Sequence, residues 1–116
     1  MKRFLATFLL LSATAMADIK ISDFQVRQGN VPGLREVNIR INVTNPGPVT
    51  QQGPIEIILL GRRRGGEWSE LQSWTVSRLP SGYQVARDYF SRIEHDYELK
   101  AQVLAPNGLS DERVWP

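Results

Sequence analysis

The chain has 116 residues, a length typical of one domain. It carries 14 basic and 12 acidic residues, one histidine and no cysteine. The missing cysteines exclude a disulfide scaffold, a thiol nucleophile, a zinc knuckle and a lipid-modified N-terminal cysteine. Because 41% of the residues are hydrophobic and 22% are charged, the composition is that of a globular domain rather than a disordered chain or a membrane bundle.

Residues 1–17 have the organisation of a secretory signal peptide. Two cations precede an apolar run over residues 4–11, and residues 15–17 (Ala-Met-Ala) present the small side chains that a signal peptidase accepts. The apolar run is too short to cross a hydrocarbon layer of about 30 Å. We expect cleavage after Ala17, which leaves residues 18–116 as a single exported domain with no membrane span, in the periplasm or outside a bacterial cell. Cleavage also removes the excess of basic residues, so the charge predicts no nucleic-acid partner.

After the signal peptide, apolar and polar residues alternate with the period of half-buried β-strands. The clearest run lies at residues 37–43 (Val-Asn-Ile-Arg-Ile-Asn-Val). A break in the alternation near Ser22 predicts a bulge or an edge in the first strand. Residues 55–60 are apolar on one face and mostly apolar on the other, which predicts a central or covered strand. The expected strands cover residues 19–26, 37–43, 55–60, 67–76, 83–90, 97–103 and 109–115.

Turn residues separate these runs. Two prolines in residues 45–48 cannot donate ladder hydrogen bonds and end the second strand. We expect a hairpin tip at residues 61–66 (Gly-Arg-Arg-Arg-Gly-Gly), a turn at residues 80–82 and a hairpin at residues 106–108. Seven short strands without a helical period predict an all-β fold, an antiparallel immunoglobulin-like β-sandwich without a disulfide. A small Greek-key barrel is the alternative.

Two aromatic residues fit the sandwich. Tyr97 opens the sixth expected strand, where a tyrosine in such folds bonds back to the backbone and fixes the crossover between the sheets. Trp74 is expected to pack as a large side chain between the two sheets.

Four segments carry a resemblance to a known family. They are residues 18–21 (Asp-Ile-Lys-Ile), 41–47 (Ile-Asn-Val-Thr-Asn-Pro-Gly), 79–83 (Leu-Pro-Ser-Gly-Tyr) and 97–103 (Tyr-Glu-Leu-Lys-Ala-Gln-Val). Together they resemble the cell-adhesion-related domain of bacteria, CARDB. Residues 97–112 are equally similar to the end of a fibronectin type III domain. Both resemblances imply an immunoglobulin-like sandwich, and the CARDB family has no common catalytic residues.

The sequence offers little for catalysis. His95 lies between two acids, but adjacent residues of a strand point to opposite faces, so the three converge only in a loop. The serines lack the Gly-x-Ser-x-Gly context, and no glycine-rich phosphate loop precedes a helix. Glu67 and Glu70 form a conceivable carboxylate pair, but a domain of this size offers little cleft for a sugar. We therefore predict no enzyme, no catalytic residue, no cofactor and no metal site.

The candidate residues for partner binding are arginines and tryptophans. Arg62, Arg63 and Arg64 concentrate guanidinium groups that can bind carboxylates or an acidic partner. Trp68 and Trp115 could stack on a sugar. If the second face of residues 55–60 is uncovered, it also marks an interface.

Two functional hypotheses follow. The first is a non-catalytic exported module that docks onto an envelope or extracellular protein, through an edge strand or through loop contacts. The alternative is a carbohydrate or small-ligand binder that uses the surface tryptophans and arginines.

Overall fold

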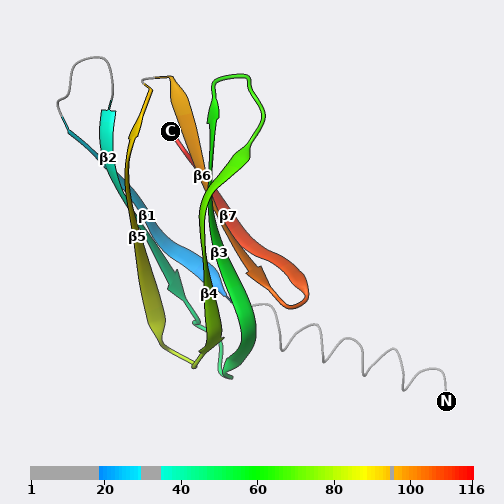
Figure 1. The fold of residues 1–116 in the computed structure, drawn as a ribbon. Helices are drawn as coiled ribbons and strands as arrows, with labels where there is room; N and C mark the ends of the chain where they lie inside the picture. Colours follow the sequence, from blue (N-terminus) through cyan, green and yellow to red (C-terminus); the bar gives the residue numbers. More distant parts are fainter. Residues whose placement is uncertain (1–18, 30–34, 95) are drawn as a thin grey trace, which may run out of the picture.

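The computed structural model describes residues 19–29, 35–94 and 96–116. The expected signal peptide and His95 lie outside these residues. The described chain forms seven β-strands, which follow one another in Figure 1. They are β1 (Lys20–Gln28), β2 (Arg35–Thr44), β3 (Gln51–Arg63), β4 (Ser69–Leu79), β5 (Gln84–Ile93), β6 (Tyr97–Ala105) and β7 (Gly108–Trp115).

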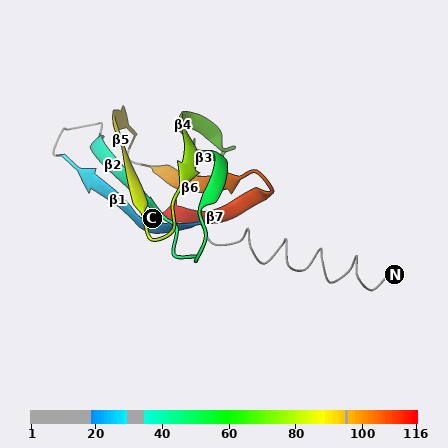
Figure 2. The ribbon, with the colours of Figure 1, turned by 90° about the horizontal axis from the view of Figure 1, so that it is seen from below.

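The strands form two antiparallel sheets that pack face to face (Figure 2). One sheet has the order β1-β2-β5, and the other has the order β4-β3-β6-β7. The prediction of an all-β sandwich is therefore confirmed, and β3 is a central strand as expected. β4 pairs with β3 and so adds a fourth strand to the sheet of β3, β6 and β7, as in immunoglobulin-like domains whose second sheet is extended by one strand.

The core lies between the sheets and consists of the inward half of each alternating run. Every second residue of β2 is fully buried, from Val37 to Val43. Opposite them, β3 contributes Ile55, Ile57 and Leu59, each at most 1% exposed. Burying one such side chain stabilises the fold by roughly 1.5–3 kcal/mol, so the alternation can hold a domain that has no disulfide. β6 adds Leu99, Ala101 and Val103.

Side chains of β7 join the two sheets along one edge. The Asp111 carboxylate accepts a 2.8 Å hydrogen bond from the backbone nitrogen of Ile21. The Ser110 hydroxyl donates a 2.6 Å hydrogen bond to the carbonyl oxygen of Ile19. The register of β1 shifts between Ile21 and Asp23, which confirms the predicted bulge. Asp111 therefore binds a backbone group beside the bulge, at an edge strand of the other sheet.

A buried asparagine organises the end of the sandwich where residues 45–50 meet the β4–β5 turn. Asn45 is 2% exposed, and its Nδ2 donates to the carbonyl oxygens of Val49 and Leu79. Its Oδ1 accepts from the backbone nitrogen of Gly47 at 3.0 Å. The residue therefore satisfies backbone groups that the prolines of this loop leave outside the strand ladders.

The third strand is longer than its alternation indicates, so the predicted hairpin tip at residues 61–66 is wrong in its first half. Gly61, Arg62 and Arg63 belong to β3, and the turn begins at Arg64. Gly61 is buried, and a Cβ there would lie 2.8 Å from the Leu71 side chain. This glycine therefore reflects close packing inside a strand, whereas Gly65, with a φ of 79°, supplies the conformation of the turn.

Both aromatic residues named from the sequence lie at the core's margin. Tyr97 begins β6 as expected, and it packs against the core. The backbone hydrogen bond expected of its hydroxyl stays a prediction.

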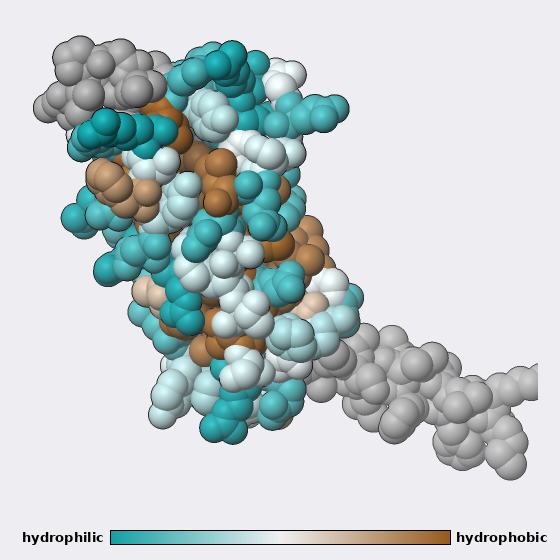
Figure 3. All heavy atoms as spheres, viewed as in Figure 1, coloured by the Kyte–Doolittle hydropathy of each residue, from teal (hydrophilic) through white to brown (hydrophobic). Residues whose placement is uncertain are grey.

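Trp74 lies on the inward side of edge strand β4, opposite Ile57, and packs against the core, but it is only half-buried. In Figure 3, apolar residues appear as separate brown patches between hydrophilic side chains.

Candidate docking face

The outward face of the four-stranded sheet carries apolar side chains. The alternation of β3 places Ile58 and Leu60 on this face, and both are half-buried. Leu104 of β6 pairs with Leu109 of β7, which is 55% exposed. Val114 of β7, opposite Lys100, is 53% exposed. Within the described residues no further layer covers this face, which we call the docking face. It consists of Ile58, Leu60, Leu104, Leu109 and Val114 with the polar and charged residues between them, among which Gln102 and Glu112 lie in one row with Ile58.

A cluster of charged and aromatic side chains lies at one end of the docking face. Arg62 Nε donates a 3.0 Å hydrogen bond to Glu98, and both side chains are partly buried. The Arg62 guanidinium also lies 4.2 Å from the centroid of the Trp68 ring, and Lys100 Nζ lies 4.4 Å from it. The negative π faces of the ring attract both cations, so the three side chains form one cluster. The cluster thus forms a rim beside the apolar residues.

The structure separates the three arginines that the sequence places together. Arg62 and Arg63 are neighbours in a strand, so their side chains point to opposite faces. Arg63 Nη2 lies 2.7 Å from the Glu94 carboxylate, which raises the pKa of Arg63 above its usual value. Arg64 is exposed in the turn, and its backbone nitrogen bonds Asp96 O. Only Arg62 lies on the docking face.

The three tryptophans do not form one platform. Trp68 lies beside the docking face, whereas Trp74 and Trp115 pack against the core from β4 and β7, the two edge strands of this sheet. A single sugar cannot stack on rings at opposite edges of a sheet. The arrangement therefore gives no support to a shared tryptophan platform.

The sequence indicated part of the docking face and missed the rest. Arg62 and Trp68 were candidates because of their residue types, and the outward residues of β3 follow from its alternation. Glu98 and Lys100 belong to the polar half of β6 and to no motif that the sequence shows. Leu104 was missed because that strand was expected to end at residue 103, whereas it continues to Ala105.

The side chains of the docking face are suited to contact with another protein. Apolar side chains with charged neighbours are typical of protein contact surfaces. No group of three or more histidine, aspartate or glutamate residues in the described part of the chain could hold a metal ion. No described helix has the length and hydropathy to pass through a bilayer.

The comparisons with known proteins identify a fold. No family model and no curated protein matches the sequence. Among solved structures, a domain of a β-galactosidase from Bacteroides fragilis is similar at 14% identity and a TM-score of 0.67, over 84% of this chain but 17% of that enzyme. The archaellum periplasmic stator protein complex FlaF and FlaG from Sulfolobus acidocaldarius contains a similar chain at 13% identity and a TM-score of 0.58, with 86% and 90% of the two chains covered.

The chain is an immunoglobulin-like β-sandwich. It spans less than a fifth of the glycosidase, whose match is confined to one domain. A stator protein FlaG from the same archaeon also matches, at 14% identity and a TM-score of 0.53, over 97% of its length. These similarities show the fold, whereas the specific resemblance to CARDB has no support from a family model.

Proposed function

We propose that this chain is an exported, non-catalytic module that docks onto a protein partner through the docking face. The observation that carries the proposal is the group of apolar side chains on the outward side of β3, β6 and β7, with Leu109 and Val114 more than half exposed. In an isolated sandwich these apolar side chains stay in contact with water. A partner that covers them would gain a binding free energy of about 25 cal/mol per Å² of apolar surface removed from water.

The size of the face indicates a modest interface. Four strands spaced about 4.8 Å apart, with four outward residues each, cover roughly 400 Å². Stable complexes bury about 800 Å² per partner. The sheet alone is therefore suited to a weak or transient contact, and a stable complex needs neighbouring surface such as the turn that carries Arg64.

The comparisons support this class of function without assigning the partner. A sandwich of nearly the same extent occurs in a complex described as an archaellum periplasmic stator. An exported location also agrees with the predicted signal peptide. Isolation of the exported form and sequencing of its N-terminus should give Asp18 as the first residue, and a retained residue 1 would contradict cleavage.

Site-specific cross-linking in the producing cell tests the docking face. A photoreactive amino acid at Leu104, on this face, should give a discrete adduct with one partner. The same amino acid at Ala86, on the outward side of the other sheet, is the matched control. The substitution L60E should remove the adduct while the Tm stays near that of the wild type. Equal adducts at both positions, or an adduct that survives L60E, would contradict the proposal.

The alternative function is a carbohydrate or small-ligand binder that uses Trp68 or Trp115 with nearby arginines. The two tryptophans share no common platform, so each would have to bind a ligand separately. This alternative predicts that neutral oligosaccharides change the fluorescence of Trp68. Titration of the W68F variant beside the wild type isolates the signal of this ring.

A further inference from the structure

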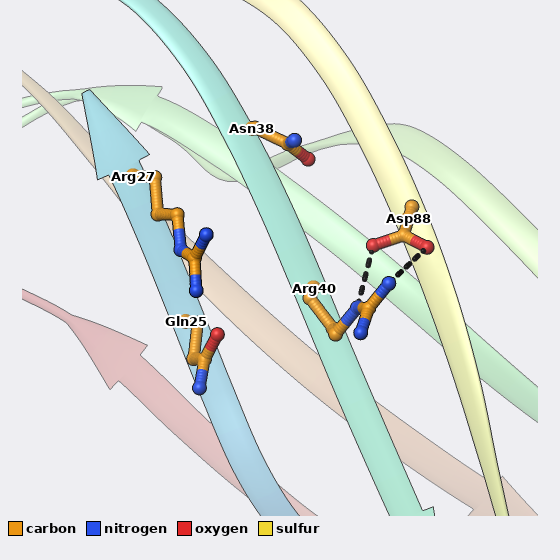
Figure 4. Close-up of a pocket in the computed structure, with 5 residues that line it drawn as sticks. All are labelled: Gln25, Arg27, Asn38, Arg40 and Asp88. Atoms are coloured by element: carbon orange, nitrogen blue, oxygen red, sulfur yellow. Dashed lines mark hydrogen bonds and ion pairs between the residues drawn. The ribbon is translucent and has the colours of Figure 1, made fainter. Parts of the chain in front are cut away.

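The outward face of the other sheet holds a shallow polar pocket that is separate from the docking face. Its lining comes from three strands, as Figure 4 shows: Gln25 and Arg27 from β1, Asn38 and Arg40 from β2, and Asp88 from β5. The strand register arranges the outward side chains in two adjacent rows. One row is Arg27, Asn38 and Phe90, and the other is Gln25, Arg40 and Asp88.

The pocket contains one cation that no acid neutralises within the described part of the chain. Arg40 donates to both carboxylate oxygens of Asp88, at 2.9 and 3.2 Å, so this pair is balanced. Asp23 accepts a 2.7 Å hydrogen bond from the Gln25 amide. Arg27 is exposed and has no such bond to a described residue. Its planar guanidinium is suited to two parallel hydrogen bonds with a carboxylate.

The carboxylate and amide groups of the pocket can form hydrogen bonds with the hydroxyl groups of a ligand. The Asp88 carboxylate has about four lone-pair sites, and Arg40 uses two of them. The remaining sites can accept hydrogen bonds from hydroxyl groups. The amides of Gln25 and Asn38 both donate and accept, which matches the dual character of a sugar hydroxyl.

An exposed aromatic ring completes the set. Phe90 is 65% exposed and lies beside Asn38 in the register. Exposure of this large apolar side chain to water is unfavourable in free energy. Its flat ring can pack against the C–H face of a sugar ring. Two rows across three strands measure about 10 Å by 7 Å, which accommodates one pyranose unit.

We propose that the outward face of β1, β2 and β5 binds a uronic-acid unit of an acidic glycan. The sugar carboxylate pairs with Arg27, its hydroxyls bond Asp88 and the two amides, and its ring lies on Phe90. An acidic peptide fits less well, because it has few hydroxyl groups to donate to Asp88 and the two amides. This site is independent of the docking face.

Titration of the full exported chain with tetragalacturonic acid, followed by NMR of the backbone amides, tests the proposal. We expect shifts confined to β1, β2 and β5. The fully methyl-esterified tetramer keeps the hydroxyls but lacks the charges, and it should bind at least tenfold more weakly. Tetraglutamate keeps the charges but lacks the hydroxyls, and it should also bind at least tenfold more weakly. Equal binding of either compound would overturn the proposal.

Variants assign the binding to named residues. R27Q should weaken binding of tetragalacturonic acid at least tenfold, and F90S should weaken it severalfold. R78Q removes an exposed arginine from β4, a strand of the other sheet, and is the matched control, which should bind as the wild type does. Both test positions are exposed, so the Tm should change little. Unchanged binding by R27Q would refute the site, and a loss by R78Q equal to that by R27Q would show nonspecific charge attraction instead of a site.

Discussion

Asn45 donates a 2.9 Å hydrogen bond to the carbonyl oxygen of Leu79, a residue 34 positions further along the chain. The bond joins the loop after β2 to the end of β4, and Asn45 makes two more side-chain hydrogen bonds within its own loop. Figure 1 shows these segments together at one end of the sandwich. One buried amide therefore connects the two sheets at the end where the prolines leave the backbone without ladder partners.

The substitution N45A should lower the free energy of unfolding by about 3 kcal/mol. It leaves the carbonyl oxygen of Leu79 without its donor in a buried place and that of Val49 without its donor in a part-buried one, and each buried unsatisfied group costs about 1–3 kcal/mol. Urea denaturation measures the change. N42A removes the same side chain from a partly exposed outward position and should cost less than 1 kcal/mol. Equal losses in the two variants would contradict the role of Asn45.

Gly61 is the second position where the packing makes a sharp prediction. An alanine Cβ would lie 2.8 Å from the Leu71 side chain and 3.0 Å from the Tyr97 ring. We expect G61A to destabilise the fold by about 1–3 kcal/mol through overpacking. The double variant G61A/L71A tests the cause, because removal of Leu71 provides space. The cost of G61A should be smaller in that background, and simple additivity would contradict the steric explanation.

Asp111 closes the edge between β1 and β7, so D111A should destabilise the sandwich by about 2 kcal/mol. Its carboxylate accepts from the backbone nitrogens of Ile21 and Glu112, and hydrogen bonds to a charged group contribute about 1.5–3 kcal/mol. The neighbouring variant E112A loses only an exposed bond with Gln102 and serves as the control. Amide hydrogen exchange of Ile21 should accelerate in D111A alone, and unchanged exchange would refute the contact.

The cluster at the rim of the docking face predicts a measurable cation–π contribution. W68A removes the ring from Arg62 and Lys100, and each exposed contact is worth about 0.5–1 kcal/mol. We expect a loss of about 1–2 kcal/mol in urea denaturation. In the R62Q/K100Q background the same substitution should cost less than half as much. A loss that is the same in both backgrounds would mean that the ring acts through apolar packing.

The Arg40–Asp88 pair predicts a dependence of stability on pH. Hydrogen bonds from Arg40 hold the pKa of Asp88 below its usual value. Because the pKa is lower in the folded state, the pair stabilises the fold above the unfolded pKa, and this contribution is lost as the pH falls through the folded value. The difference in urea midpoint between the wild type and D88N should therefore be larger at about pH 6 than at about pH 2. A constant difference would contradict the pairing.

The sequence was sufficient for the fold because β2, β3 and β6 each place an unbroken set of apolar residues on their inward side. The run from Val37 to Val43 specifies the buried side of β2, since a shift by one residue would expose it. The break near Ser22 likewise marked the bulge of β1. Strand ends were harder to predict, because Gly61 in β3 looks like a turn residue until its packing against Leu71 is seen.

The candidate sites could be predicted only in part. Arg62 and Trp68 could be identified as candidates from the sequence. Their partners Glu98 and Lys100 lie more than thirty residues away in the chain, and the pairing of β3 with β6 brings them close. The pocket of the other sheet was missed altogether, because Arg27, Asn38 and Phe90 come from three strands and share no local motif.

By itself, the sequence determined an all-β sandwich that is held by apolar alternation without a disulfide, because burial depends on the local period of each strand. Only the tertiary structure decided which outward residues lie together. It separated the three arginines, spread the tryptophans over two edges and one face, and left the outward side of β3 uncovered by any other described residue layer. The physical reason is that strand pairing, which depends on contacts far apart in the chain, sets the neighbours of every surface side chain.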